Sequence, residues 1–388
     1  MSSFDHAADE PRIALVHDYF TQRGGAELVA ARIARLFPGA AMFTSVVDPS
    51  ALPAGLAPGR LRTTDLQPWY AAGLPLRSLA PVLPAAFARL DLGDPAVVIS
   101  STSAFAHHVR PPAGALHVAY CHAPPRFAWQ PDEYFREAPL ERRFLAPALA
   151  AIRRLDERAA RRVDVYVANS RATADRIARA YGRRAIVVPP PIETDRFTPS
   201  TERNGRFLVV SRLRHHKRID LAIVAAARLS VPLDIVGEGP DEARLRRMAG
   251  PTVTFLGRLS DTGVADAMAR CVGLVVPAAE DFGMTMAEVQ AAGRPPIAFG
   301  DGGALEIVED GTTGFLVREP TADALCAGML RACGTPLDPT LLVHSARRFD
   351  ARRFDRAMLD LVRGAVAARR DSADDAAASA ATAARRAS

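Results

Sequence analysis

The feature that most constrains this chain is its alternation of short apolar runs, rich in β-branched residues, with amphipathic helical patterns. Such alternation is typical of parallel sheets covered by helices on both faces. At 388 residues the chain is also longer than one hydrophobic core usually supports, which favours two domains. We therefore predict an α/β protein made of two doubly wound halves, in which ligands bind outside the carboxyl ends of the strands.

The expected elements fall into two series. Strands are predicted at 12–17, 40–45, 96–100, 116–121, 163–169 and 185–189, and then at 206–211, 232–237, 253–257, 273–277, 295–299 and 314–317. Helices are predicted at 25–36, 140–162 and 171–181, and then at 217–229, 240–249, 262–270, 284–292, 303–309 and 321–333.

A proline-rich, non-periodic segment at 189–205 is predicted to be the linker between the halves. It separates an N-terminal domain over 1–188 from a C-terminal domain over 206–350. Residues 351–368 are expected to form a last helix that returns to the first half. The Ala/Ser/Arg/Asp-rich tail at 371–388 is expected to be disordered.

Composition indicates a cytoplasmic protein. No apolar run approaches the roughly 20 residues needed to span a bilayer, and the acidic, polar start does not resemble a secretory signal. The four cysteines form no Cys-x-x-Cys pair, which argues against a disulfide framework or a zinc site and fits a reducing compartment. The net charge of +6 allows an anionic partner: nucleic acid, a membrane surface or a phosphorylated small molecule.

The strongest chemical signal is VVPAAEDFGMTMAEVQAAGRPPIAFGDGG at 275–303. A buried strand is followed by Glu280 in a loop, by Gly283 and by a helix that carries Glu288. Free N–H groups at a helix start, together with the helix dipole, suit a diphosphate. Carboxylates accept hydrogen bonds from sugar hydroxyls. The pattern favours a site that holds a hexose and a ribose on either side of a diphosphate, and the alternative is a surface pair of glutamates.

A second signal is FLVVSRLRHHKRIDLAI at 207–223, where a strand ends and Arg212 and Lys217 follow before a helix. A guanidinium and an ammonium both suit phosphate oxygens. Lys217 is the only lysine in the chain. The alternative interpretation is a solvated basic helix start.

These two segments resemble family 4 glycosyltransferases with the GT-B fold, in which two Rossmann-like domains face each other across a donor-binding cleft. Glu280 and Glu288 have the family's E-x7-E spacing, and 207–223 resembles its G-R-L-x-x-x-K-G segment, with Ser211 and Arg218 in place of the glycines. The resemblance implies that Glu280 lies by the transferred sugar and that Glu288 binds the ribose. It also implies that backbone amides between them meet the sugar and phosphates, from Phe282, Gly283, Met284 and Thr285.

Further segments match the same family in order. DIVGEGPDEARL at 234–245 resembles its G-x-G-P turn and contributes Gly237 to the donor site. VTFLGRLSD at 253–261 resembles the stretch beside the base, which suggests Arg258 or Leu259 at the base edge.

In the first half, HDYFTQRGGAELVAARIA at 17–34 resembles the family's glycine loop, so Gly24 and Gly25 are expected at the donor phosphate. His122, in YCHAPPRFAWQ, matches a family histidine that reaches the transferred sugar. Three positions are assigned to the acceptor side of the cleft: Asp18, Tyr19 and Asn169.

Two segments leave their role open. The basic helix at 136–162 suits either an anionic membrane near a lipid-linked acceptor or a solvated face. The apolar, proline-interrupted stretch at 66–90 suits either an acceptor-side lip or core packing.

The resemblance is narrower to bacterial O-antigen and exopolysaccharide mannosyltransferases, which implies transfer of a hexose, GDP-mannose first, with retention of configuration. The expected partners are a nucleotide-sugar donor and a lipid-linked or saccharide acceptor. No Asp-x-Asp pair occurs, so we expect no metal and no cofactor, with Arg212 and Lys217 neutralising the leaving group. Alternatives are a UDP-glucose or UDP-galactose enzyme, another sugar-nucleotide reaction, an inactive scaffold, and a nucleic-acid binder. The last is disfavoured because aromatic residues are only 6% of the chain.

Overall fold

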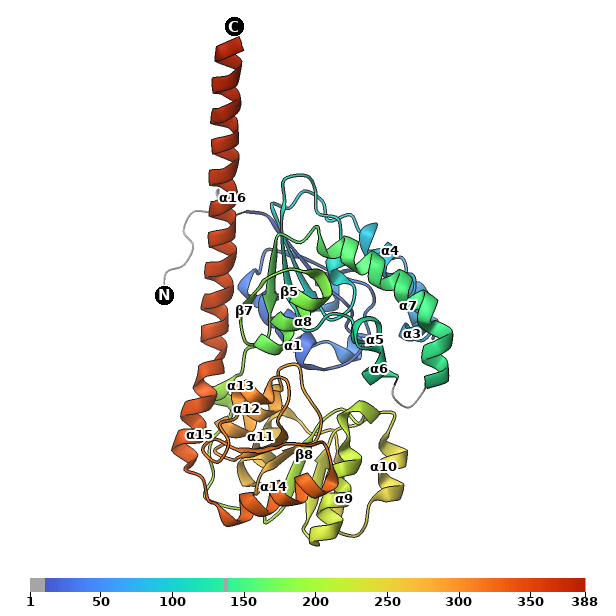
Figure 1. Ribbon diagram of the computed structural model, residues 1–388, viewed down its shortest axis with the longest axis vertical. Helices are drawn as coiled ribbons and strands as arrows, with labels where there is room; N and C mark the ends of the chain where they lie inside the picture. Colours follow the sequence, from blue (N-terminus) through green and yellow to red (C-terminus); the bar gives the residue numbers. More distant parts are fainter. Residues whose placement is uncertain (1–10, 136–138, 388) are drawn as a thin grey trace. The chain divides into compact units, whose positions relative to one another are not determined.

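The computed structural model describes residues 11–135 and 139–387 (Figure 1). Contacts between residues divide the chain into two compact units. The first contains residues 1–169, 173–188 and 355–388, and the second contains 170–172 and 189–354. Each unit is a parallel sheet with its own helices and hydrophobic core, as the two series of strand and helix patterns predict.

In the first unit the described residues form a seven-stranded sheet in the order β3-β2-β1-β4-β5-β6-β7. Every neighbouring pair of these strands is parallel. The strands are β1 Ile13–His17, β2 Ala41–Thr44, β3 Leu61–Thr63, β4 Val97–Thr102, β5 Leu116–Cys121, β6 Val165–Ala168 and β7 Ala185–Val187. The order reverses between β1 and β4, and this reversal is the switch point at which doubly wound sheets bind ligands.

The helices of this unit include two with the predicted bounds, α1 Gly25–Leu36 and α8 Arg171–Tyr181. The others are α2 Gln67–Ala71, α3 Leu76–Leu79, α4 Leu83–Ala88, α5 Arg126–Trp129, α6 Pro131–Tyr134 and α7 Pro139–Ala160, with short 3-10 turns η1 Pro49–Ala51, η2 Pro58–Arg60 and η3 Ala106–His108. The stretch at 66–90 serves partly as core, because Leu83 and Phe87 are buried, whereas Trp69 is exposed.

The second unit repeats the same topology with six strands among the described residues, in the order β10-β9-β8-β11-β12-β13, all parallel. Its strands are β8 Phe207–Val210, β9 Leu233–Val236, β10 Val253–Gly257, β11 Leu274–Val276, β12 Pro296–Phe299 and β13 Phe315–Val317. Its helices are α9 Ile219–Leu229, α10 Glu242–Met248, α11 Asp261–Arg270, α12 Met284–Ala291, α13 Ala304–Ile307, α14 Ala322–Gly334 and α15 Pro339–Ala346, with turns η4 Thr194–Arg196, η5 His215–Lys217 and η6 Arg347–Phe349.

The central strands of both sheets are buried along their whole length, which is why they read as continuous apolar runs rather than as alternating ones. In the second unit, for example, Phe207 and Ile235 belong to one hydrophobic cluster, while Leu208 and Val236 belong to another. The second sheet therefore separates two apolar layers of helices.

The segment at 189–205 was expected to be a linker, but it is part of the second unit. Ile192 and Phe197 are buried in that unit's core. The Arg294 guanidinium donates to the carbonyl oxygens of Ser200 at 2.6 Å and Glu202 at 2.9 Å. The proline content that suggested a linker reflects an extended segment held by these contacts.

The prediction of a disordered tail is also corrected, because helix α16 runs from Ala351 to Ala387. Scarcity of apolar residues suggested disorder, but alanine and arginine have high helix propensity, and neither proline nor glycine follows Gly364. Residue 388 lies outside the described residues. The helix contacts the first unit through ion pairs of Arg32 with Asp355 and of Arg369 with Asp164.

Candidate functional site

The chemistry-bearing residues of the second unit gather where the order of its sheet reverses, between the neighbouring strands β8 and β11. Arg212 and Lys217 lie in the loop and 3-10 turn that follow β8, and Glu280 lies in the loop that follows β11. Because the carboxyl ends of adjacent parallel strands meet at one edge, residues 63 positions apart become neighbours.

Lys217 and Glu280 form a direct ion pair at this edge. Lys217 Nζ donates to Glu280 Oε1 at 2.7 Å and to Oε2 at 2.6 Å. The side chains are 16% and 21% exposed, so the pair is largely shielded but open to a ligand. The lysine predicted to bind phosphate and the glutamate predicted to lie by the sugar are thus brought together.

The backbone around this pair depends on glycine for close approach. A Cβ at Gly237 would lie 1.9 Å from the Ser211 carbonyl oxygen, and a Cβ at Gly303 would lie 2.0 Å from the Phe282 carbonyl oxygen. Gly303 N also donates to Glu280 O at 2.9 Å. The loops after β9 and β12 therefore support the loops that carry Arg212 and Glu280, and any side chain at either glycine would displace them.

Glu288 lies on α12 and is held by Arg196, whose Nη2 donates to its Oε1 at 3.1 Å. Burial raises the pKa of Glu288, and the Arg196 guanidinium partly offsets that rise. Helix α12 starts after Gly283, which has left-handed φ, and no side chain among the described residues caps it. Its first turn thus offers backbone donors beside the Lys217–Glu280 pair. Sequence reasoning missed Arg196 because it lies in the segment that was predicted to be a linker.

The remaining predicted donor residues differ in what their side chains can do. Phe282 is buried and packs edge-to-face on Phe349, so only its backbone is available to a ligand. Arg258 is exposed and lies 3.7 Å from Glu238, while Leu259 packs against the core. Met284 and Thr285 are half-buried at the start of α12.

One departure from the family pattern has a visible backbone consequence. Arg218, which replaces a glycine of the family segment, has φ of 51° and ψ of 36°, in the left-handed region. It is the N-cap of α9, directly after Lys217. A non-glycine residue there costs roughly 1–2 kcal/mol of backbone strain, so the chain keeps the glycine geometry without the glycine.

In the first unit His122 follows β5 and is nearly buried. Its Nε2 lies 2.8 Å from Ser101 Oγ, which also lies 3.1 Å from Nδ1 of the buried His17. The Asn169 amide donates to the His122 carbonyl oxygen at 3.0 Å. Asn169 therefore positions the loop that carries His122.

Asp18 was expected on the acceptor side, but its geometry gives it a structural role. It is 1% exposed, and its carboxylate accepts N–H bonds from Ala104, Phe105 and Ala106 at 2.6–2.9 Å. These contacts fix the loop after β4 at the first sheet's switch point. Tyr19 is half-buried beside it.

Gly24 and Gly25 lie at the start of α1, where a helix was predicted to begin. Gly24 is the N-cap of that helix, and no described side chain caps it.

Comparisons with known proteins agree with the predicted family and fold. The family model described as Glycosyltransferase Family 4 matches residues 23–196, and the one described as Glycosyl transferases group 1 matches residues 192–340. The chain is similar to a GDP-mannose-dependent alpha-(1-6)-phosphatidylinositol monomannoside mannosyltransferase of Mycolicibacterium smegmatis. The two are 33% identical over 216 residues, which is 47% of this chain and 55% of the relative.

It is also similar to the O-antigen chain mannosyltransferase C of Escherichia coli, with 29% identity over 194 residues, 45% of this chain and 52% of that one. The chain thus spans about half the length of the curated relatives it matches.

Among solved structures, HepE of Anabaena in complex with UDP and glucose superimposes with a TM-score of 0.68 at 20% identity, over 91% of this chain and 99% of that one. The sucrose-phosphate synthase of Thermosynechococcus elongatus gives a TM-score of 0.69 at 19% identity, over 92% of this chain and 100% of that one. These likenesses confirm the predicted fold. The two family models together match residues 23–340, and the chain belongs to the family 4 glycosyltransferases with the GT-B fold.

Proposed function

We propose that this chain is a retaining hexosyltransferase that uses a nucleotide-diphosphate sugar, most favourably GDP-mannose, and needs no metal ion. The observation that carries the proposal is the Lys217–Glu280 pair at the switch point of the second sheet, beside the uncapped start of α12. This arrangement offers a cation and backbone donors for a diphosphate and a carboxylate for a sugar hydroxyl within one site.

In the proposed reaction the acceptor hydroxyl oxygen bonds to the anomeric carbon on the face from which the diphosphate leaves. The hydroxyl proton passes to an oxygen of the departing phosphate, so charge and atoms balance and the configuration is retained. Lys217 and Arg212 stabilise the negative charge that develops on the leaving group. Glu288, held by Arg196, accepts hydrogen bonds from the ribose, and His122 is assigned to the transferred sugar.

GDP-mannose is the first candidate donor because both relatives described above are named as mannosyltransferases, and one of these two is named as GDP-mannose-dependent. A UDP-hexose is the second candidate, because the solved structure of similar fold contains UDP and glucose. Sugar choice depends on a few pocket contacts worth only a few kcal/mol, which fold similarity does not fix.

For the acceptor we propose a lipid-linked or saccharide substrate of surface polysaccharide synthesis. We also propose that α7 binds an anionic membrane surface, where the chain would encounter this acceptor. Among the described residues no helix is both long and apolar enough to cross a bilayer. Residues 136–138 of the predicted basic helix lie outside the described residues. On α7 itself, Leu140 and Phe144 are 72% and 84% exposed next to Arg142 and Arg143, a pattern that suits an interfacial helix.

The membrane contact has its own test. Co-sedimentation with phosphatidylglycerol vesicles should exceed that with phosphatidylcholine vesicles, and Phe144→Ser should reduce it. Equal sedimentation of both proteins with both vesicles would leave α7 as a solvated face.

The donor proposal is tested by thermal shift with GDP, UDP, ADP and their sugars in the presence of a chelator. A ligand at 100 times its dissociation constant stabilises by about 2.7 kcal/mol. Lys217→Met should abolish the shift, while Arg214→Gln, which removes an exposed charge from the same loop, should keep it. A shift in melting temperature with UDP alone would favour a UDP-hexose over GDP-mannose as donor. No shift with any of the nucleotides would overturn the transferase proposal. A β-linked product from an α-linked donor would exclude retention.

A further inference from the structure

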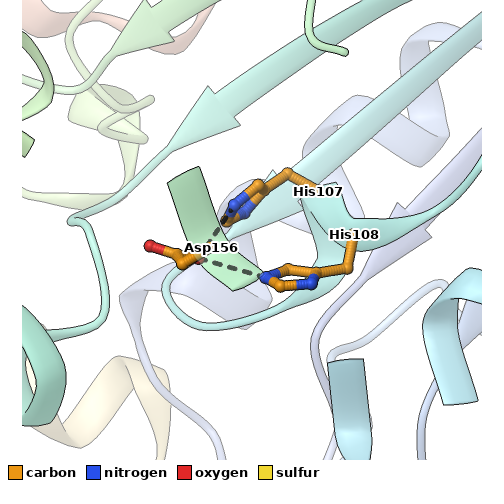
Figure 2. Close-up of side chains that lie close together, drawn as sticks. All are labelled: His107, His108 and Asp156. Atoms are coloured by element: carbon orange, nitrogen blue, oxygen red, sulfur yellow. Dashed lines mark hydrogen bonds and ion pairs between the residues drawn. The ribbon is translucent and has the colours of Figure 1, made fainter. Parts of the chain in front are cut away.

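Three titratable side chains converge in the interior of the first unit, away from the residues assigned to the reaction (Figure 2). His107 and His108 come from η3 and Asp156 from α7, and all three are buried. Nε2 of His107 lies 3.0 Å from Asp156 Oδ1, and Nε2 of His108 lies 3.1 Å from the same oxygen. Figure 2 shows both rings pointing at one carboxylate oxygen from one side.

The His107 ring has an unusual hydrogen-bond arrangement. Nε2 is 3.0 Å from Asp156 Oδ1, but among the described residues it has no hydrogen-bond partner of regular geometry. On the other side of the ring, Nδ1 lies 3.3 Å from Thr102 Oγ1. The Thr102 hydroxyl in turn donates to Asp18 Oδ1 at 3.4 Å.

The second carboxylate oxygen is already held in place. Trp129 Nε1 donates to Asp156 Oδ2 at 2.7 Å, and the Tyr181 hydroxyl donates to it at 2.8 Å. Metal-binding carboxylates and imidazoles are commonly oriented by such outer hydrogen bonds. Here both the carboxylate and the His107 ring are oriented, and Oδ1 faces the two Nε2 atoms, with a hydrogen bond to His108 Nε2 at 3.1 Å that a bound ion would replace.

We propose that His107, His108 and Asp156 form a structural site for one divalent transition-metal ion, with zinc the first candidate. Bond lengths of 2.0–2.2 Å in a tetrahedral zinc site place neighbouring ligand atoms roughly 3.3 Å apart. The observed N–O separations of 3.0 and 3.1 Å need a small expansion, and the two Nε2 atoms lie within 4.8 Å of each other. An ion between the ligands would also give the buried His107 Nε2 a partner of regular geometry.

Such an ion would join the elements around it. The ligands come from η3 and α7, and the residues that orient them come from α5 and α8. Thr102 connects the site to the loop of His122, whose backbone N–H donates to the Thr102 carbonyl oxygen at 2.8 Å. The ion would thus stabilise the first unit and the strand end behind His122, without touching substrate.

The test uses the full chain, expressed without a histidine tag and purified without chelators. Elemental analysis should find about one zinc per chain. The protein is then unfolded with a chelator and refolded with or without Zn²⁺ or Co²⁺, and the visible absorption of Co²⁺ reports its binding. Refolding with metal should raise the melting temperature by about 5 °C or more.

Asp156→Asn and His108→Asn should lose the metal, whereas His117→Asn, which removes a buried histidine outside the group, should retain it. If the first two variants fail to fold, the wild-type metal content and refolding decide alone. A wild-type chain that carries less than about a tenth of an equivalent and gains no stability from either ion would overturn the proposal. Equal metal loss in His117→Asn would do the same, because it would show that the binding does not depend on this group.

Discussion

The ion pair between Lys217 and Glu280 leads to a prediction about the free enzyme as well as the reaction. Without a donor, both lysine contacts of 2.6 and 2.7 Å go to the carboxylate. A diphosphate that binds Lys217 must compete with that carboxylate. Glu280→Gln keeps the shape of the side chain but removes its charge, so the lysine becomes available to phosphate at lower cost.

The magnitude follows from the exposure of the pair. Solvent-exposed ion pairs are worth about 0–1 kcal/mol, and this pair, at 16% and 21% exposure, lies at the upper end of that range. Releasing about 1 kcal/mol corresponds to roughly fivefold tighter binding. We therefore expect Glu280→Gln to bind the nucleoside diphosphate about fivefold more tightly while losing most of its sugar transfer. Lys217→Met should lose both.

Titration calorimetry with GDP and UDP measures these affinities on the wild type, both single variants and the double variant. The double variant should bind like Lys217→Met, because no lysine remains to be released. Arg214→Gln serves as the matched control and should bind like the wild type. If Glu280→Gln binds the diphosphate several-fold more weakly than the wild type, then the glutamate does not compete for the lysine, and the argument fails.

Three further predictions concern stability and loop geometry. Arg218→Gly should stabilise the chain by up to about 1 kcal/mol in urea unfolding, because glycine relieves the left-handed strain and loses some of that gain to backbone entropy; a destabilised variant would show that the Arg218 side chain contributes more than the strain. Gly303→Ala should lower the free energy of unfolding by about 1–3 kcal/mol and slow sugar transfer, because the new Cβ would lie 2.0 Å from the Phe282 carbonyl oxygen. Unchanged transfer kinetics would argue against a role for the loop after β12. Burial lowers the pKa of His117 to about 3, so the unfolded chain takes up a proton below about pH 6.5 and the folded chain does not. The free energy of unfolding should therefore fall from pH 6.5 towards pH 3, by at most about 1.4 kcal/mol per pH unit. The variant His117→Asn should lack this part of the pH dependence.

Local patterns were sufficient to predict most of the fold. Helices α1 and α8 have the bounds that periodicity indicated. The strands lie within a residue or two of the expected runs, except for β3 Leu61–Thr63, which was not predicted. Lys217 and Glu280 could be assigned because each lies directly after a strand, and parallel topology brings adjacent strand ends together. The periodicity of an element and the order of the elements can both be read from residues that are close together in a single sequence.

Contacts between distant segments could not be read in the same way. Arg196 holds Glu288 across 92 positions, from a segment whose proline content resembled a linker. The group around Asp156 gathers side chains from η3, α5, α7 and α8, and no spacing along the chain marks it as a group. In α16, composition gave the wrong answer, because a lack of apolar residues weakens packing but does not oppose helix formation.

The two sheets share one topology but use their switch points differently. In the first, the buried Asp18 carboxylate occupies the backbone N–H groups that follow β4, so a negative charge lies where a phosphate would otherwise bind. In the second, the equivalent edge carries Lys217, and the helix start next to it has no side-chain cap. Because the Asp18 carboxylate already occupies its backbone N–H groups, whereas Lys217 can exchange Glu280 for a phosphate, we expect the donor diphosphate to bind at the second unit. Under the proposed function, His122 at the end of β5 is then expected to contact the transferred sugar rather than the nucleotide.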